Sequence, residues 1–260
     1  MASTQSSPQA PEPALPPGHI PAVAPAWHTA VFVILMLGVA FVQAMPRFAQ
    51  REAHLPSRIP LYISTLLYEL FLLGYVWLGV WLRRTSLRDL IGGRWARWKD
   101  FWIDVGIAFI FWLVVSTVLV LLSLALRFNG NEAASFLMPQ TVREMIVWVV
   151  VATSAGFCEE LIFRGYLQRQ CLALTQNVAA AVILQGLIFG SAHAYQGAKG
   201  VIVISVYGMM FGALAAMRKS LRPGMMQHAT QDTISGLAMH MISWLRHLQG
   251  KLQHVPLIRF

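Results

Sequence analysis

Charged residues are scarce in this chain: 12% of its 260 residues are Asp, Glu, Lys or Arg, whereas 57% are hydrophobic. Soluble domains carry about 25% charged residues. Cysteine is almost absent, since only Cys158 and Cys171 occur, and this excludes a disulfide framework and a paired-cysteine metal site. The chain also lacks the short alternating segments of a transmembrane barrel. This composition indicates a helical protein embedded in lipid.

The positive charge lies between the apolar segments. The chain has 20 Lys and Arg against 11 Asp and Glu, a net charge of +9. Basic loops beside anionic lipid headgroups explain this distribution, and nucleic-acid binding is not indicated. The second and sixth loops hold Arg83, Arg84, Arg88, Arg94, Arg97, Lys99, Arg218, Lys219 and Arg222. The positive-inside rule therefore predicts a plasma (inner) membrane protein whose N-terminus and even-numbered loops face the cytoplasm.

Several apolar segments approach or exceed the roughly 20 residues that cross a bilayer. They occupy residues 29–45, 60–82, 104–126, about 145–168, 177–193, 200–217 and 224–245. We predict an all-α fold, a polytopic transmembrane bundle of about seven helices (six to eight), forming a single domain over residues 29–250. Residues 1–28 are rich in Pro and Ala and lack the basic start of a signal peptide, so we expect a disordered tail there.

The stretch AGFCEELIFRGYLQ, residues 155–168, places three charged side chains inside the fourth apolar segment. A charge at the centre of a membrane helix costs about 2.5–3.5 kcal/mol even on the mildest scale. Glu160 and Arg164 are four residues apart on one helix face and can therefore pair. Glu159 is rotated by about 100° and is left to face elsewhere. The pair fits a structural tie as well as a chemical role, whereas Glu159 is the stronger functional candidate.

Two histidines fall at the ends of later apolar segments. His193 closes the fifth segment in FGSAH, and His228 opens the seventh in HATQD. With a hairpin turn near residue 175, Glu159 and His193 differ in depth by about 3 Å, because each helical residue rises about 1.5 Å. Asp232 lies one turn after His228, where its carboxylate can orient the imidazole.

We expect these polar groups to share one water-holding cavity, because charged groups survive at membrane depth where they line such a cavity. The fourth, fifth and seventh helices should enclose it, with Glu159, His193 and His228 converging on one water. Glu160 should turn away from that point toward Arg164. The cavity should open toward the fourth and sixth loops, on the cytoplasmic side.

The segments EELIFR, FGSAH and HATQD match the patterns EExxxR, FxxxH and HxxxN/D. In this order the sequence resembles the CPBP family of intramembrane endopeptidases, which includes CAAX prenyl proteases and bacteriocin-immunity relatives, over residues 145–245. The resemblance implies that Glu159 and His193 act as an acid/base pair on water. It also implies that His228 and Asp232 stabilise the transition state, although the family often has asparagine at the position of Asp232. The implied reaction is hydrolysis of a peptide bond in a membrane-associated protein or peptide.

Alternatives remain for the metal and for the function. Glu159, His193 and His228 form a possible zinc set with an open fourth position. The motif HExxH is absent, and a carboxylate can activate water alone, so we favour a glutamic site without metal. The same residues could instead form the relay of a proton-coupled transporter, or belong to a catalytically silent immunity or scaffold relative. Glu69, a carboxylate in the second apolar segment, has either a structural or a gating role.

Overall fold

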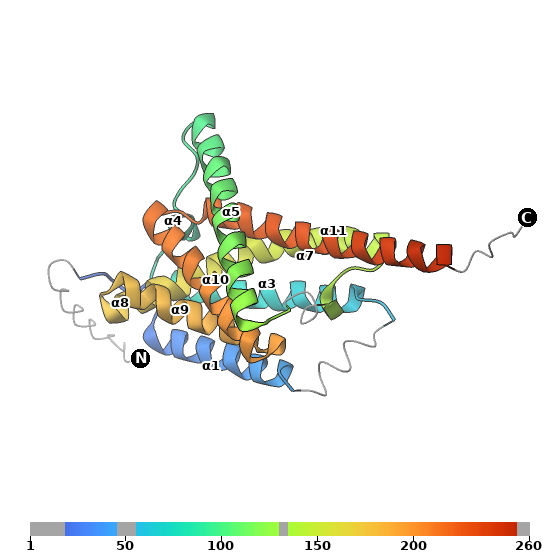
Figure 1. Ribbon diagram of the computed structural model, residues 1–260. Helices are drawn as coiled ribbons and strands as arrows, with labels where there is room; N and C mark the ends of the chain where they lie inside the picture. Colours follow the sequence, from blue (N-terminus) through green and yellow to red (C-terminus); the bar gives the residue numbers. More distant parts are fainter. Residues whose placement is uncertain (1–18, 46–55, 130–134, 254–260) are drawn as a thin grey trace, which may run out of the picture.

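The computed structural model describes residues 19–45, 56–129 and 135–253. Within these ranges the chain forms helices with short connections and contains no strand, which confirms the predicted all-α class. Figure 1 shows the long helix α5 crossing the direction of α7 and α11, which lie side by side. The helices are α1 (Ala26–Gln43), α3 (Ile59–Leu82), α4 (Leu87–Ile91), α5 (Trp98–Leu126), η1 (Ser135–Leu137), α7 (Val142–Glu159), η2 (Glu160–Leu167), α8 (Gln168–Thr175), α9 (Val178–Ala192), η3 (Ala194–Gln196), α10 (Gly197–Arg218) and α11 (Arg222–Gln253).

Five helices of the described ranges are long and apolar enough to cross a membrane. They are Ala26–Gln43, Ile59–Leu82, Trp98–Leu126, the continuous Val142–Thr175 and Ala194–Arg218. Only 11% of the most apolar window of α5 is buried inside the protein. Because soluble proteins rarely expose an apolar surface of this size to water, this surface faces lipid. The chain is therefore an integral membrane protein with a polytopic helical bundle.

Two of the seven expected spans, α9 (Val178–Ala192) and α11 (Arg222–Gln253), are helices that are not both long and apolar enough to cross a membrane. Helix α9 has 15 residues, and at about 1.5 Å per residue it covers only about 22 Å, less than the roughly 30 Å of a hydrocarbon core. Helix α11 is long, with 32 residues. It is not among the apolar spans, because polar side chains such as Gln227, His228, Gln231 and Asp232 interrupt its apolar residues.

The segment that precedes α1 is packed against the bundle. The side chain of Gln170 accepts hydrogen bonds from the backbone amides of Val23, at 2.7 Å, and Ala24, at 3.1 Å. His28, fully buried in α1, lies 2.8 Å through Nδ1 from the hydroxyl of Tyr166. The tail that we expected through residue 28 therefore ends earlier, because these amides are tied to α8. Residues 1–18 of that tail lie outside the described residues.

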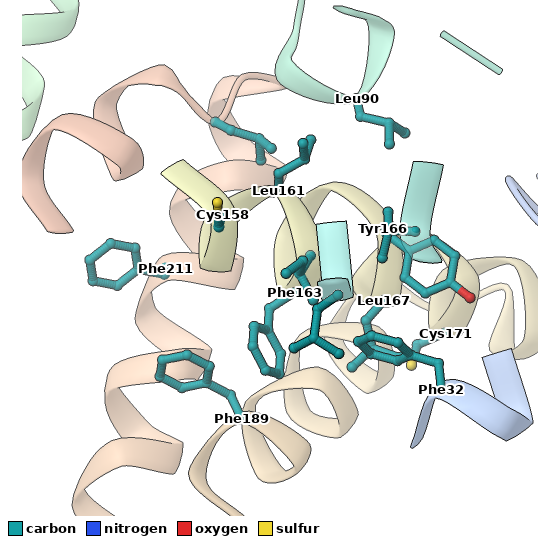
Figure 2. Packing of buried hydrophobic residues seen from close by; sticks show 14 of the residues in the cluster. Phe32, Leu90, Cys158, Leu161, Phe163, Tyr166, Leu167, Cys171, Phe189 and Phe211 are labelled. Atoms are coloured by element: carbon teal, nitrogen blue, oxygen red, sulfur yellow. The ribbon is translucent and has the colours of Figure 1, made fainter. Parts of the chain in front are cut away.

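The centre of the core is the π-helical segment η2. All eight of its residues are buried, and Leu161 and Tyr166 have no exposed surface. Figure 2 shows Phe32, Leu90, Phe189 and Phe211, which come from α1, α4, α9 and α10, gathered around this segment. The segment that carries Glu160 and Arg164 is thus fully enclosed by the surrounding helices.

Candidate active site

A cavity of about 580 Å³ lies between α5, α7, α9, α10 and α11. Four of the residues selected from the sequence line it: Glu159, His193, His228 and Asp232. The expected enclosure by the fourth, fifth and seventh apolar segments is present, and α5 and α10 complete the walls with residues such as Leu119, Leu124, Val203 and Ile204. The polar groups therefore line one cavity, and apolar side chains form the rest of its walls.

The cavity extends in a different direction from the one expected. It is lined by Phe128 and Asn129 after α5, and by Tyr195 and Gln196 in the connection between α9 and α10. Its lining, within the described ranges, includes no residue of the α8–α9 or α10–α11 turns. The expected opening toward those turns, the fourth and sixth loops, is not seen, because α10 lines the cavity only with residues from its first half.

A close approach of α7 and α11 brings the glutamates to His228. A Cβ atom on Gly156 would lie 2.6 Å from the backbone nitrogen of Ala229. This distance is too short for a carbon–nitrogen contact, so only glycine fits at this position. At Gly236, an added Cβ would collide with the indole of Trp148, whose Nε1 donates a hydrogen bond of 2.9 Å to the carbonyl of Asp232. Two glycines thus allow the helix contact, and one tryptophan fixes its register.

Glu160 and Arg164 form the ion pair that their spacing predicts. Arg164 NH1 lies 3.0 Å from Glu160 Oε1, and the two side chains are 0% and 1% exposed. Arg164 also donates to the carbonyl of Gly208 at 3.2 Å, and its guanidinium lies 4.4 Å from the ring centroid of Phe189 and 5.1 Å from that of Phe211. The cation is therefore held by one carboxylate, one carbonyl and two aromatic faces.

The imidazole of His228 is surrounded by three carboxylates. Its Nδ1 lies 3.1 Å from Glu160 Oε1, while its Nε2 lies 3.8 Å from Glu159 Oε2 and 3.7 Å from Asp232 Oδ2. A carboxylate only accepts hydrogen bonds, so Nδ1–H donates to Glu160. The sequence predicts that Asp232 can orient this ring; in the structure the shortest carboxylate contact of the ring is with Glu160.

Glu159 differs from its neighbour as expected. Its side chain is 23% exposed and lines the cavity, whereas that of Glu160 is 1% exposed. Within the described ranges, Glu159 Oε2 is buried without a hydrogen-bond partner. An unpaired buried acceptor is costly unless water or a ligand satisfies it. This carboxylate is therefore available to a molecule that enters the cavity.

His193 follows the end of α9 and is oriented by its own motif. Its Nδ1 lies 2.9 Å from the carbonyl of Phe189, so Nδ1 carries the proton and Nε2 of the neutral ring is an acceptor. The ring packs 4.8 Å from that of Phe189. Phe189 in turn meets Phe163 of η2 edge to face, with ring centroids 4.7 Å apart. Figure 2 shows the two rings near each other. The FxxxH spacing thus fixes one tautomer of His193 against the segment that carries the glutamates.

The three possible zinc ligands are not arranged around a metal position. Among the described residues, no group of three His, Cys, Asp or Glu side chains could hold a metal ion. His228 Nδ1 is occupied by Glu160, which leaves Nε2, 3.8 Å from Glu159 Oε2, as the nitrogen open to a ligand. A site without metal stays a prediction, and no chemical step is derived through a metal.

Sequence reasoning missed three features of the site. The π-helical form of η2, a geometry frequent at functional sites, has no signal in the apolar pattern. The contact between Glu160 and His228 joins two motifs that we had read separately. Tyr207 of α10 also lines the cavity, and its only signal was a phenol within an apolar segment.

Glu69 has the hydrogen bond that a structural role requires. Its side chain is 4% exposed, and its Oε2 accepts a hydrogen bond of 2.5 Å from Ser154 Oγ in α7. Glu69 is not among the residues that line the cavity. It therefore ties α3 to α7 through Ser154.

Comparison with known proteins agrees with the motif pattern. Residues 141–234 match the family model described as type II CAAX prenyl endopeptidase Rce1-like. No curated protein and no solved structure matches the chain. The matched segment includes every residue of the charged and histidine motifs, from Glu159 to Asp232. The resemblance to the CPBP and CAAX protease family is thereby confirmed.

Proposed function

Because the chain carries a domain of the type II CAAX prenyl endopeptidase Rce1-like family, a family of membrane proteases, we propose that it hydrolyses peptide bonds with water activated by Glu159. The observation that carries this proposal is the unpaired carboxylate of Glu159 in the cavity, with the Nε2 atom of His228 at 3.8 Å. Glu160 is committed to Arg164 and His228, so Glu159 is the carboxylate that is free to take a proton.

The first step is attack by water on the scissile carbonyl. Glu159 accepts one proton from the water, and Nε2 of neutral His193 accepts a hydrogen bond that orients it. The water oxygen forms a bond to the carbonyl carbon, and the electron pair of the carbonyl moves to its oxygen. When this intermediate collapses, the bond to nitrogen breaks and the leaving amine takes the proton that Glu159 holds. Water is consumed, and Glu159 returns to its starting state.

His228 stabilises the negative charge that develops on the carbonyl oxygen. With Nδ1–H donating to Glu160, a second proton on Nε2 makes the ring a cation whose free N–H can donate to the oxyanion. Asp232, 3.7 Å from Nε2, stabilises this cation and helps to orient the imidazole ring. The Glu160–Arg164 pair supports the site indirectly, because it fixes the carboxylate to which His228 donates.

The proposed substrate is a membrane-associated protein or peptide. The cavity combines the polar groups with apolar side chains from α5 and α10, so a lipid-bound or hydrophobic segment can lie beside the scissile bond. Location in the plasma (inner) membrane with access from the cytoplasm stays a prediction. Because Phe128, Asn129, Tyr195 and Gln196 of the third and fifth loops line the cavity, cytoplasmic access requires the topology opposite to the one that the positive-inside rule predicts. Labelling a Lys199→Cys variant with a membrane-impermeant maleimide would show which surface the α9–α10 end of the cavity faces.

The test of the function uses purified full-length protein in lipid nanodiscs. It would be incubated with synthetic peptides ending in a farnesylated CAAX sequence and with matched unprenylated peptides, and products would be identified by mass spectrometry. We expect cleavage of at least one peptide by the native protein and none by Glu159→Gln. Equal cleavage by both proteins would contradict the role of Glu159. Proton-coupled uptake in proteoliposomes without cleavage would favour a transporter.

A further inference from the structure

Tyr207, in the first half of α10, has a buried hydroxyl that the mechanism above does not use. The residue is 6% exposed. Among the described residues its hydroxyl has no hydrogen-bond partner. Buried tyrosine hydroxyls usually find a partner, and one without a partner in the resting protein is available to a ligand.

The phenol lies in the same cavity as the proposed catalytic groups. Tyr207 lines it together with Glu159, His193 and His228. Its ring centroid is 5.6 Å from that of His228 in an edge-on contact and 4.6 Å from that of Phe211. The aromatic neighbours hold the ring in place, so the position of the hydroxyl is fixed before substrate binds.

The residues of the charged and histidine motifs supply few groups that can donate a hydrogen bond to an oxyanion. Glu159, Glu160 and Asp232 accept only when ionised, and Nδ1 of His228 is engaged by Glu160. His193 donates through Nδ1 to the carbonyl of Phe189. Nε2 of His228 is thus the single donor supplied by these residues, whereas oxyanion sites work through several donors aimed at the developing charge.

We propose that the hydroxyl of Tyr207 is the second oxyanion donor, acting together with Nε2–H of His228. This inference rests on the proposed peptidase function. As the electron pair moves to the carbonyl oxygen, the phenol O–H forms a hydrogen bond to it and keeps its proton. The bond is released when the intermediate collapses and the carbonyl is restored. Tyr207 would then be a catalytic residue that contacts the reacting oxygen.

The test is Tyr207→Phe, which removes the hydroxyl and keeps the aromatic contacts. Loss of one oxyanion donor lowers kcat by about 100- to 1000-fold. We expect that loss with KM changed less than threefold. We also expect a melting temperature equal to or above that of the native protein, because the hydroxyl has no partner in the resting state.

Tyr62→Phe is the matched control. Tyr62 of α3 is not among the residues that line the cavity, and its hydroxyl donates a hydrogen bond of 2.7 Å to the carbonyl of Leu137. We expect its kcat to stay within a few-fold of native. Near-native kcat in Tyr207→Phe, or an equal loss in both variants, would overturn the proposal, as would a loss explained by a lower melting temperature.

The outcomes separate this inference from the function on which it rests. If the native protein cleaves and Glu159→Gln does not, the peptidase assignment stands, and the kcat of Tyr207→Phe decides the role of the phenol alone. If the native protein cleaves none of the peptides, the peptidase assignment fails and the role of Tyr207 fails with it.

Discussion

His228 Nδ1 lies 3.1 Å from Glu160 Oε1, the same oxygen that Arg164 NH1 approaches at 3.0 Å. One buried carboxylate oxygen therefore joins the charged motif of η2 to the histidine motif of α11. Any change at Glu160 acts on two groups, the guanidinium that it neutralises and the imidazole that it orients.

Glu160→Gln should destabilise the protein strongly, by about 3–5 kcal/mol, because it leaves the fully buried Arg164 without its counter-ion. Thermal unfolding in detergent would measure the loss. The control is Asp100→Asn, at an ion pair whose Arg97 side chain is 76% exposed, where about 0–1 kcal/mol is expected. A fully stable but inactive Glu160→Gln would instead give Glu160 a direct chemical role through His228.

Glu159→Gln should lower turnover by about 100- to 10,000-fold, which is the usual contribution of a general base. The melting temperature should stay close to that of the native protein. The reason is that its Oε2 is buried without a hydrogen-bond partner in the described structure, so a neutral isostere removes only the long contact of 3.8 Å with His228 Nε2. Peptide cleavage and thermal unfolding would be measured on the same preparation. Turnover close to native would exclude Glu159 as the base.

Removal of metal should leave activity intact, because in the proposed mechanism the carboxylate of Glu159 activates water without a metal. Activity would be measured after treatment with 1,10-phenanthroline, with a zinc protease treated in parallel. Metal content would be determined by plasma mass spectrometry. One zinc per chain, with activity lost on chelation and regained on adding zinc, would contradict the proposed mechanism.

Gly156→Ala should push α7 away from α11 and reduce both stability and turnover. The added Cβ would lie 2.6 Å from the nitrogen of Ala229, and overpacking of this kind costs about 1–3 kcal/mol. Gly74→Ala is the matched control in α3, because nothing lies within 4 Å of its added Cβ and alanine is the better helix former. Equal behaviour of the two variants would show that the close helix contact does not position Glu159.

The apolar pattern and the spacing of charges predicted much of this architecture. The helix order, the hairpin after Thr175 and the pairing of Glu160 with Arg164 follow from periodicity, chain length and the cost of a lone charge in an apolar setting. The separate exposure of Glu159 follows from its rotation around the helix. These features depend on local geometry, which the order of residues specifies directly.

The remaining features depend on how helices tilt and meet. The α-helical period assumes regular hydrogen bonds four residues apart, so it could not reveal the π-helical turns of η2. The contact of His228 with Glu160 requires the approach of Gly156 to Ala229, and η2, α8, α9 and α10 lie between these two residues in the chain. The direction of the cavity depends on which half of α10 faces it, and Tyr207 could be recognised only once that face was known.

The shortness of α9 has a consequence for the lipid around it. A helix that covers about 22 Å leaves a deficit of about 8 Å against a hydrocarbon core of about 30 Å, and bilayers adjust to such a deficit by thinning locally. His193 follows the end of this helix, so a bilayer thinned beside α9 would bring polar headgroups and their water toward His193. Water for the proposed hydrolysis would then reach the cavity over a short distance from the bilayer surface.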